Sequence, residues 1–208
     1  MIELWHCKDA RSLRALWTLE ELELPYTLHL LKFPPRFTDP GFTEVNSLGT
    51  VPYLKDGETR MTESSGIAHY LATRYGEGTL AVAPDSPDYG DWLNWMYHSD
   101  ATLTFPQTLV LRYGRFEPKE RRQPQVVDDY TQWFFSRLKL VNARLEGHEY
   151  LCADRFTAAD ITVGYALYLT ELIGLGAHLK PQTRAYLERL MERPGFQRAN
   201  DQGQPLLG

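Results

Sequence analysis

The feature that most constrains the fold of this chain is a change of pattern after Gly76. Up to that residue, segments with strand and helix patterns alternate. From Glu77 to Pro87 the sequence turns to Gly, Pro, Asp and Ser, as a linker does, and beyond it only helical patterns remain. We therefore predict an α/β domain at residues 1–76, a linker at 77–87 and an all-α helical domain at 88–208.

The order of the segments before Gly76 predicts a small mixed sheet covered by helices. The stretch VPYLKDGETRM predicts a β-hairpin with an Asp-Gly turn. The other expected elements are strands at 2–5 and 26–31, helices at 12–22, 41–45 and 65–75, and a proline-containing loop at 33–37. In the second part, helices are predicted at 92–113, 126–145, 157–173 and 182–192, the last ended by Pro194.

Charge and composition exclude several classes of protein. The chain has 208 residues, 43% of them apolar, and a net charge of -5 with scattered basic residues, so no nucleic-acid or anionic-membrane partner is expected. The first residues lack the pattern of a signal or transit peptide, so we expect a cytoplasmic protein. Two cysteines, Cys7 and Cys152, build no disulfide framework, and no metal site is predicted.

Val51-Pro52 stands directly before the predicted hairpin. A proline that opens a strand is usually an edge residue, and a cis X-Pro bond is the rarer alternative. A cis bond would turn the N–H and C=O of Val51 outward, towards an extended peptide-like ligand.

The stretch TESSGI contains Glu63, Ser64 and Ser65 where the hairpin passes into a helix. One interpretation is helix capping by a serine, with Glu63 favoured at the positive end of the helix dipole. The other is a ligand site, because a helix N-terminus and a serine hydroxyl bind a carboxylate while Glu63 pairs with an ammonium group. The second interpretation predicts a site for an α-amino acid head group.

Four stretches carry a resemblance to a known family. They are NSLGTVPYL, TESSGIAHYL, YLCADRFTAADITVGYAL and YLERLMERPGFQRA, in this order, and the third contains a capping-box variant at Thr157 and Asp160. Together they resemble the cytosolic glutathione transferase superfamily, and RSLRALWTLEEL is similar to the first helix of its bacterial and fungal members.

The resemblance implies a thioredoxin-like N-terminal domain that binds glutathione as a co-substrate, and a helical domain that provides most of the site for a small apolar electrophile. It implies that Val51, before a cis Pro52, pairs with the cysteinyl backbone of glutathione, with Thr50 beside it. It further implies that Glu63 and Ser64 hold the γ-glutamyl end.

In the helical domain, the resemblance points to a substrate site on the first long helix. It implies that Tyr97 and Phe105 line the pocket for the second substrate, and that Asp100 reaches the glutamyl ammonium. Tyr97 and Asp100 share a helix face at a spacing of i, i+3. The resemblance also implies a homodimer and a role in detoxification.

The residue that activates the glutathione thiol is left open. Serine-type members carry a hydroxyl where this chain has Ala10. Ser12 is one candidate, as a hydrogen-bond donor to the sulfur or as a helix cap, and Arg11 is another, through its charge. Cys7 is the third, and implies a mixed disulfide with glutathione unless it is an inert buried thiol.

We therefore predict a glutathione S-transferase. One alternative is a glutathione-binding protein of the same fold without catalysis, because a fold does not imply a function. The other is a glutathione-dependent thiol oxidoreductase that uses Cys7.

Overall fold

The computed structural model describes residues 1–206, which fold as two compact units. The first unit consists of residues 1–81 and the C-terminal segment from Leu190, and the second of residues 82–189. The C-terminal segment thus packs with the N-terminal part of the chain, and the predicted linker at 77–87 is shared between the two units. That the predicted α/β domain ends at residue 76 and the predicted helical domain begins at residue 88 stays a prediction.

The first unit is built on a four-stranded mixed sheet in the order β2-β1-β3-β4. Its strands are β1 (Ile2–His6), β2 (Tyr26–Leu30), β3 (Tyr53–Asp56) and β4 (Thr59–Met61). β1 runs parallel to β2 and antiparallel to β3, and β4 is antiparallel to β3. The predicted mixed sheet is confirmed.

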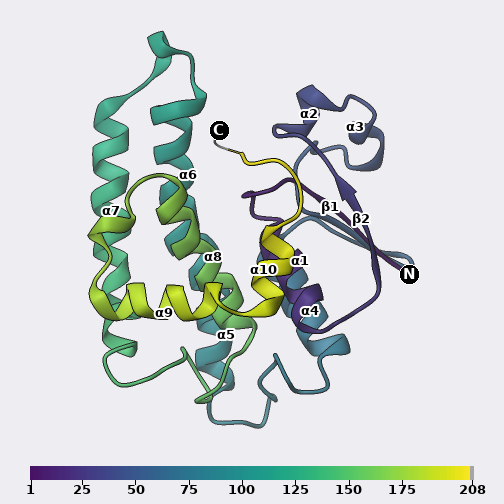
Figure 1. Cartoon of the computed structure of the whole chain (residues 1–208), viewed down its shortest axis with the longest axis vertical. Helices are drawn as coiled ribbons and strands as arrows, with labels where there is room; N and C mark the ends of the chain where they lie inside the picture. Colours follow the sequence, from purple (N-terminus) through teal and green to yellow (C-terminus); the bar gives the residue numbers. More distant parts are fainter. Residues whose placement is uncertain (207–208) are drawn as a thin grey trace. The chain divides into compact units, whose positions relative to one another are not determined.

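Alternation along β1 separates the two faces of the sheet. Leu4 lies opposite Leu54 of β3, and both are fully buried, while the next pair, Trp5 and Tyr53, packs against Phe42. The helices of this part are α1 (Leu13–Glu21), α2 (Pro35–Thr38), α3 (Phe42–Val45) and α4 (Ser64–Tyr75), and α1 and α4 lie together against the sheet (Figure 1).

Two local predictions in this unit are wrong. The sequence predicts a loop at residues 33–37, but α2 begins at Pro35, because a proline is well accommodated in the first turn of a helix. The hairpin turn lies one residue later than expected, since Asp56 pairs with Thr59 and leaves Gly57 and Glu58 in the turn. Gly57 has a φ of 57°, which a glycine adopts at no steric cost.

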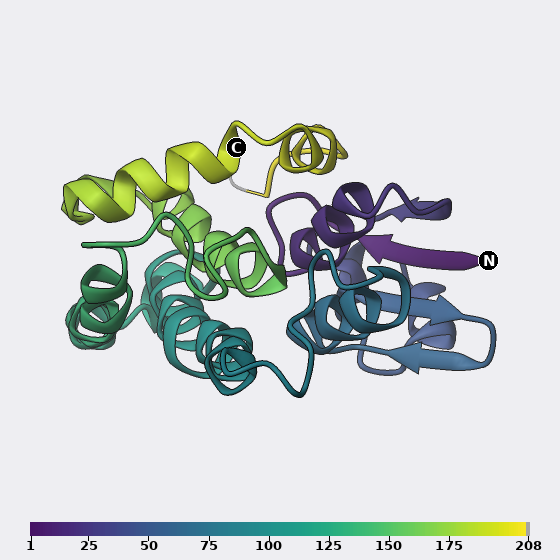
Figure 2. The same ribbon diagram turned by 90° about the horizontal axis from the view of Figure 1, so that it is seen from below.

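The first unit is completed by a helix that the sequence did not predict, α10 (Pro194–Asn200). Pro194 ends the preceding helix as expected, but it also starts α10, which lies along α1 (Figure 2). The Trp17 and Phe196 rings meet edge to face with centroids 5.0 Å apart, and Arg193 donates two hydrogen bonds of 2.8 Å to Glu21.

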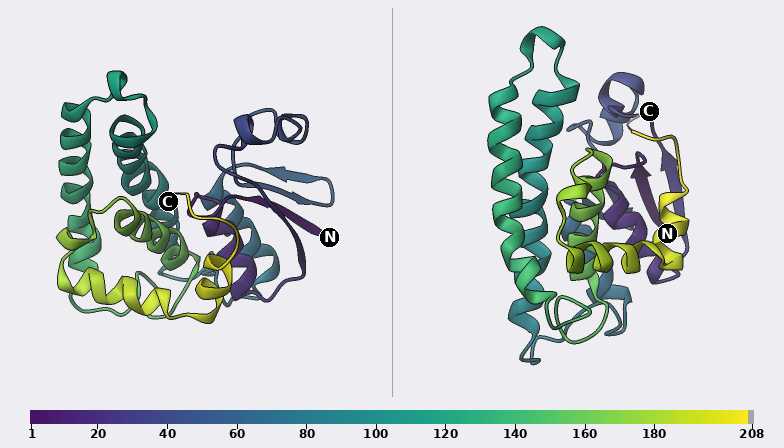
Figure 3. Two further views of the ribbon diagram at one scale, coloured as in Figure 1. Left: turned by 45° about the horizontal axis from the view of Figure 1, so that its top comes forward. Right: turned by 60° about the vertical axis from the view of Figure 1, so that its left-hand side comes forward.

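The second unit is helical throughout its regular structure, as predicted. Its α-helices are α5 (Tyr89–His98), α6 (Phe105–Leu111), α7 (Pro124–Arg144), α8 (Ala158–Leu172) and α9 (Pro181–Met191). The view on the right of Figure 3 shows α6 and α7 side by side. The helix predicted at 92–113 is interrupted, because Ser99–Thr104 and Arg112–Phe116 are π-helical.

α8 forms the buried centre of the second unit, with all residues from Ala158 to Thr170 buried. It begins with the predicted capping box. The side chain of Thr157 accepts a hydrogen bond from the backbone of Asp160, and the side chain of Asp160 accepts one from the backbone of Thr157. Within residues 1–206, no helix is long and apolar enough to cross a membrane.

Candidate functional site

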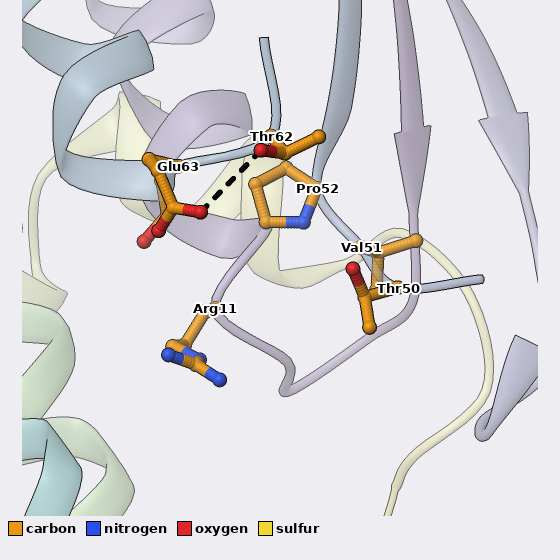
Figure 4. A pocket seen from close by; sticks show the side chains of 7 residues that line it. Arg11, Thr50, Val51, Pro52, Thr62 and Glu63 are labelled. Atoms are coloured by element: carbon orange, nitrogen blue, oxygen red, sulfur yellow. Dashed lines mark hydrogen bonds between the residues drawn. The ribbon is translucent and has the colours of Figure 1, made fainter. Parts of the chain in front are cut away.

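A pocket of about 130 Å³ in the first unit brings together six of the residues that the sequence singled out. It is lined by Arg11, Thr50, Val51, Pro52, Thr62, Glu63 and Ser64 (Figure 4). These residues come from the loop between β1 and α1, the segment before β3, and the start of α4. The pocket is therefore assembled from three segments that are far apart in the sequence.

The wall formed by Thr50, Val51 and Pro52 is held by the loop before it. The peptide bond between Val51 and Pro52 is cis. The side chain of Asn46 donates a 2.8 Å hydrogen bond to the carbonyl of Thr50 and accepts one from the Leu48 N–H. Gly49 has a φ of 58°, and a Cβ there would lie 2.7 Å from the Cβ of Arg36, so only glycine fits this turn.

The opposite wall is the N-terminus of α4. Glu63 is the N-cap residue, and its side chain makes no capping hydrogen bond. Ser64 is the first helical residue, and its Oγ instead accepts a 3.0 Å hydrogen bond from Nη1 of Arg14. The expected serine at the N-cap is therefore wrong, because Glu63 takes this position, and Glu63 and Ser64 both line the pocket.

Arg14 is a component of this wall that the sequence analysis missed. Its side chain is fully buried although it carries a charge. The available signal was its position on α1 between Leu13 and Leu16, where a polar residue would be placed inside the protein. Thr62, which lines the pocket beside Glu63, was also missed.

Arg11 is exposed and its guanidinium group lies at the pocket (Figure 4). Glu63 is exposed as well, so the pocket presents one cationic and one anionic side chain together with the positive end of the α4 dipole. This combination suits a ligand that carries both an ammonium group and carboxylates.

Ser12, the other candidate for thiol activation, does not line the pocket. Its side chain is fully buried, and its Oγ lies 2.8 Å from Nδ1 of His6, accepts from the Cys7 N–H and approaches the Cys7 carbonyl at 3.2 Å. If Nδ1–H donates to Oγ and the hydroxyl donates to Cys7, all three contacts are satisfied. Ser12 also makes no helix-capping hydrogen bond, so its contacts hold the loop in place.

Because His6 is buried, we predict that the free energy of unfolding decreases at acidic pH. Burial lowers its pKa from 6.5 to about 4, so the folded protein binds this proton more weakly than the unfolded chain does. The contribution of His6 to the free energy of unfolding is complete above the pKa that histidine has in the unfolded chain. It decreases with falling pH, by about 2 kcal/mol between pH 6.5 and 5. Urea unfolding across this range measures it.

The control for this prediction is His6→Asn, whose amide replaces Nδ1 but does not titrate. The free energy of unfolding of this variant should fall less steeply with decreasing pH than that of the wild type. Equal slopes for the two proteins would show that His6 does not remain neutral in the folded state.

Cys7 has the properties of an unreactive thiol. Its side chain is 1% exposed, and burial raises its pKa to about 12. Because the thiolate is the nucleophile, a raised pKa disfavours attack on a disulfide. Ala10 is also buried and brings no hydroxyl to this loop.

Tyr97, Asp100 and Phe105 lie in the second unit. Tyr97 is on the last turn of α5, Asp100 in the π-helical turn that follows, and Phe105 at the start of α6. Tyr97 and Phe105 are 52% and 56% exposed, so both rings are accessible on this unit. Their role in substrate binding stays a prediction.

Comparisons with known proteins support the resemblance seen in the sequence. The N-terminal domain model of glutathione S-transferase matches residues 10–74, and the C-terminal domain model matches residues 109–194. Glutathione S-transferase GstB of Escherichia coli (strain K12) is 30% identical over 207 residues, covering 95% of this chain and 97% of that protein.

Solved structures show the same fold. A glutathione transferase from Methylococcus capsulatus str. Bath has a TM-score of 0.82 and 26% identity, covering 96% of this chain and 97% of that one. A theta class glutathione S-transferase from Xanthomonas axonopodis pv. citri, with glutathione bound, has a TM-score of 0.79 and 24% identity, covering 99% and 98%. The predicted thioredoxin-like domain followed by a helical domain is thereby confirmed.

Family models match both the N-terminal and the C-terminal part of the chain, and the match to GstB extends over nearly the whole of both proteins. The chain therefore belongs to the glutathione S-transferase family.

Proposed function

We propose that this protein binds glutathione in the pocket between Arg11, Val51 and Glu63 and activates its thiol for attack on small apolar electrophiles. The observation that carries the proposal is the assembly of these residues, from three distant segments, around one pocket at the N-terminus of α4. Family membership supports the same reaction.

Each part of the pocket has a role in this proposal. The γ-glutamyl ammonium group pairs with Glu63, and its α-carboxylate accepts from the Ser64 hydroxyl and from the N-terminus of α4. The lone pair of Ser64 Oγ that faces Arg14 is occupied, which leaves the hydroxyl proton available to the ligand. The cysteinyl backbone pairs with Val51, and Thr50 lies beside it.

The thiolate is stabilised by Arg11 in this proposal. A free thiol of this type has a pKa of about 8.5, so it is mostly protonated at neutral pH. The guanidinium charge at the pocket favours the thiolate, whereas Ser12 is buried among internal partners and Ala10 offers no donor. The nucleophile is then the sulfur of the ligand, and the protein supplies charge and position.

Replacing Arg11 tests this role. In Arg11→Met, the pKa of bound glutathione is expected to rise by about one unit, which lowers kcat/KM about tenfold below that pKa and restores it at higher pH. The pH profile of kcat/KM with 1-chloro-2,4-dinitrobenzene measures the shift. Arg11→Lys keeps the charge and should keep the profile, and an unchanged profile in Arg11→Met would exclude Arg11 as the stabilising group.

The function as a whole is tested by calorimetry with glutathione and by turnover of model electrophiles. Saturable binding and conjugation are expected. A protein that neither binds glutathione nor conjugates any model electrophile would contradict the proposal. Binding without conjugation would favour a glutathione-binding protein without catalysis.

The family also guides the wider proposal. We expect Tyr97 and Phe105 to line the site of the second substrate and Asp100 to reach the glutamyl ammonium, in a helical domain that begins at residue 88. We further expect a cytoplasmic homodimer that takes part in detoxification. Sedimentation of the purified protein tests the oligomeric state.

A further inference from the structure

The loop between β1 and α1 carries Arg11, and its backbone is held by two buried side chains. Ser12, on one side of Arg11, is fixed by its contacts with His6 and Cys7. Asp9, on the other side, is 3% exposed. Arg11 itself is exposed, and its side chain is long and flexible. The place that its guanidinium group reaches therefore depends on how firmly the two neighbours hold the loop.

Asp9 is held by the other end of the chain. Its Oδ2 accepts a 2.9 Å hydrogen bond from the Leu206 N–H, 197 positions further along. Its backbone has a φ of 63°, a left-handed conformation that aspartate adopts more readily than most residues but that still costs energy. Within residues 1–206, Asp9 is not among the side chains that line the glutathione pocket. An effect of Asp9 on the ligand therefore acts through the loop.

The C-terminal segment that supplies this donor is itself fixed to the first unit. It continues from α10, which is bound to α1 by the ion pair of Arg193 with Glu21, and Figure 1 shows it in yellow. Further along, Gly203 passes so close to the loop that a Cβ would lie 3.4 Å from the Lys8 Cβ. The hydrogen bond to Asp9 therefore joins the loop to a segment that is anchored elsewhere.

The hydrogen bond between Leu206 and Asp9 is of the strong kind, because its acceptor is a buried carboxylate. If the N–H is removed, the loop has to move or admit water to solvate this carboxylate. Such a movement changes the position of Arg11 relative to the sulfur of the ligand. The attraction between a guanidinium group and a thiolate weakens as their distance grows, so the thiolate loses stabilisation.

We propose that Asp9 is a positioning residue: held by the Leu206 N–H, its carboxylate keeps the loop in the conformation that places the Arg11 guanidinium at the glutathione pocket. The inference rests on the proposed transferase function and on the role of Arg11 in it. It gives the C-terminal segment a part in activating the thiol, although none of residues 190–206 lines that pocket.

Two pairs of variants test the contact from both of its sides. Leu206→Pro removes the N–H, and Leu206→Ala is the matched control because it keeps the N–H. Asp9→Ala removes the acceptor, whereas Asp9→Asn keeps an acceptor oxygen and the tolerance for a positive φ. The ultraviolet absorbance of the thiolate measures the pKa of bound glutathione. Calorimetry with S-methylglutathione, which has no thiol, measures binding separately.

In Leu206→Pro and Asp9→Ala, the pKa of bound glutathione is expected to rise by about half a unit, which lowers kcat/KM about threefold below that pKa. The rise is smaller than that expected for Arg11→Met, because the loop still places Arg11 at the pocket for part of the time. Leu206→Ala should keep the wild-type pKa, and Asp9→Asn should lie closer to it than Asp9→Ala. Binding of S-methylglutathione should be retained in all four variants.

The same variants in the Arg11→Met background show whether Asp9 acts through Arg11. If it does, Asp9→Ala and Leu206→Pro raise the pKa of bound glutathione no further in this background. A rise that persists there would overturn the proposal. So would an unchanged pKa in folded Asp9→Ala and Leu206→Pro, even if both proteins were less stable than the wild type, because the contact would then be structural only.

Hydrogen exchange of the ligand-free protein separates this proposal from the proposed function. The amides of Ala10, Leu13 and Arg14 donate hydrogen bonds within the loop and into α1, and they should exchange faster in Leu206→Pro than in Leu206→Ala. Faster exchange in a protein that binds no glutathione would contradict the proposed function but support the anchoring of the loop. Equal exchange in the two variants would contradict the anchoring even in an active transferase.

Discussion

Replacing both Glu63 and Ser64 is expected to weaken glutathione binding about a hundredfold. Glu63→Gln removes the partner of the ligand's ammonium group, and Ser64→Ala removes the hydroxyl donor to its α-carboxylate. A hydrogen bond to a charged group contributes about 1.5 kcal/mol or more, so each change is expected to cost about tenfold in Kd. Calorimetry with the two single variants and the double variant measures these losses.

Glutathione analogues assign each loss to one group of the ligand. The Glu63→Gln effect should disappear with an analogue that lacks the α-ammonium group, and the Ser64→Ala effect with one that lacks the α-carboxylate. Glu58→Gln, an exposed acid on the hairpin, is the matched control and should leave Kd unchanged. Folded variants that bind glutathione within about threefold of the wild type would contradict the assignment of the pocket.

Replacing Asp160 with alanine is expected to lower the free energy of unfolding by about 4 kcal/mol. The carboxylate is fully buried and accepts hydrogen bonds from the Thr157 N–H at 2.8 Å, the Leu151 N–H at 3.0 Å and the Tyr186 hydroxyl at 2.8 Å. Without it, these donors remain buried and lack an acceptor. Urea unfolding at pH 7.5 measures the loss.

Thr157→Ala serves as the comparison, because it removes only the capping hydroxyl and should cost about 1 kcal/mol. Burial is the largest influence on Asp160 and raises its pKa to about 6, above its value in the unfolded chain. Its contribution to stability therefore decreases as the pH rises from about 4 to 6, and the Asp160→Asn variant should lack this dependence. A loss in Asp160→Ala no larger than that in Thr157→Ala would exclude the central role of the carboxylate.

Local features of the structure followed directly from the sequence. Alternating and helical patterns predicted all four strands and the main helices, because these patterns reflect contacts between near neighbours in the chain. The capping box at Thr157 and Asp160 has a fixed spacing, so it was also visible. The family resemblance led to Val51, Glu63 and Ser64 as one site, and the structure brings them around one pocket.

The tertiary structure decided what depends on distant residues. The sequence offered Ser12, Arg11 and Cys7 as candidates on one loop, and only the fold showed that Ser12 is enclosed by His6 and Cys7 while Arg11 reaches the pocket. Arg14 became part of the site through Ser64, fifty positions along the chain.

The position of the C-terminal segment is a second feature that only the tertiary structure decided. The sequence by itself indicated two architectures in order and an alanine at position 10 in place of a serine, and it predicted an amino-acid head site at Glu63 and Ser64. Only the tertiary structure placed α10 on α1 and the residues near Leu206 over Lys8 and Lys32. The physical reason is that burial and pairing arise from packing between segments far apart in the chain, which neither periodicity nor spacing records.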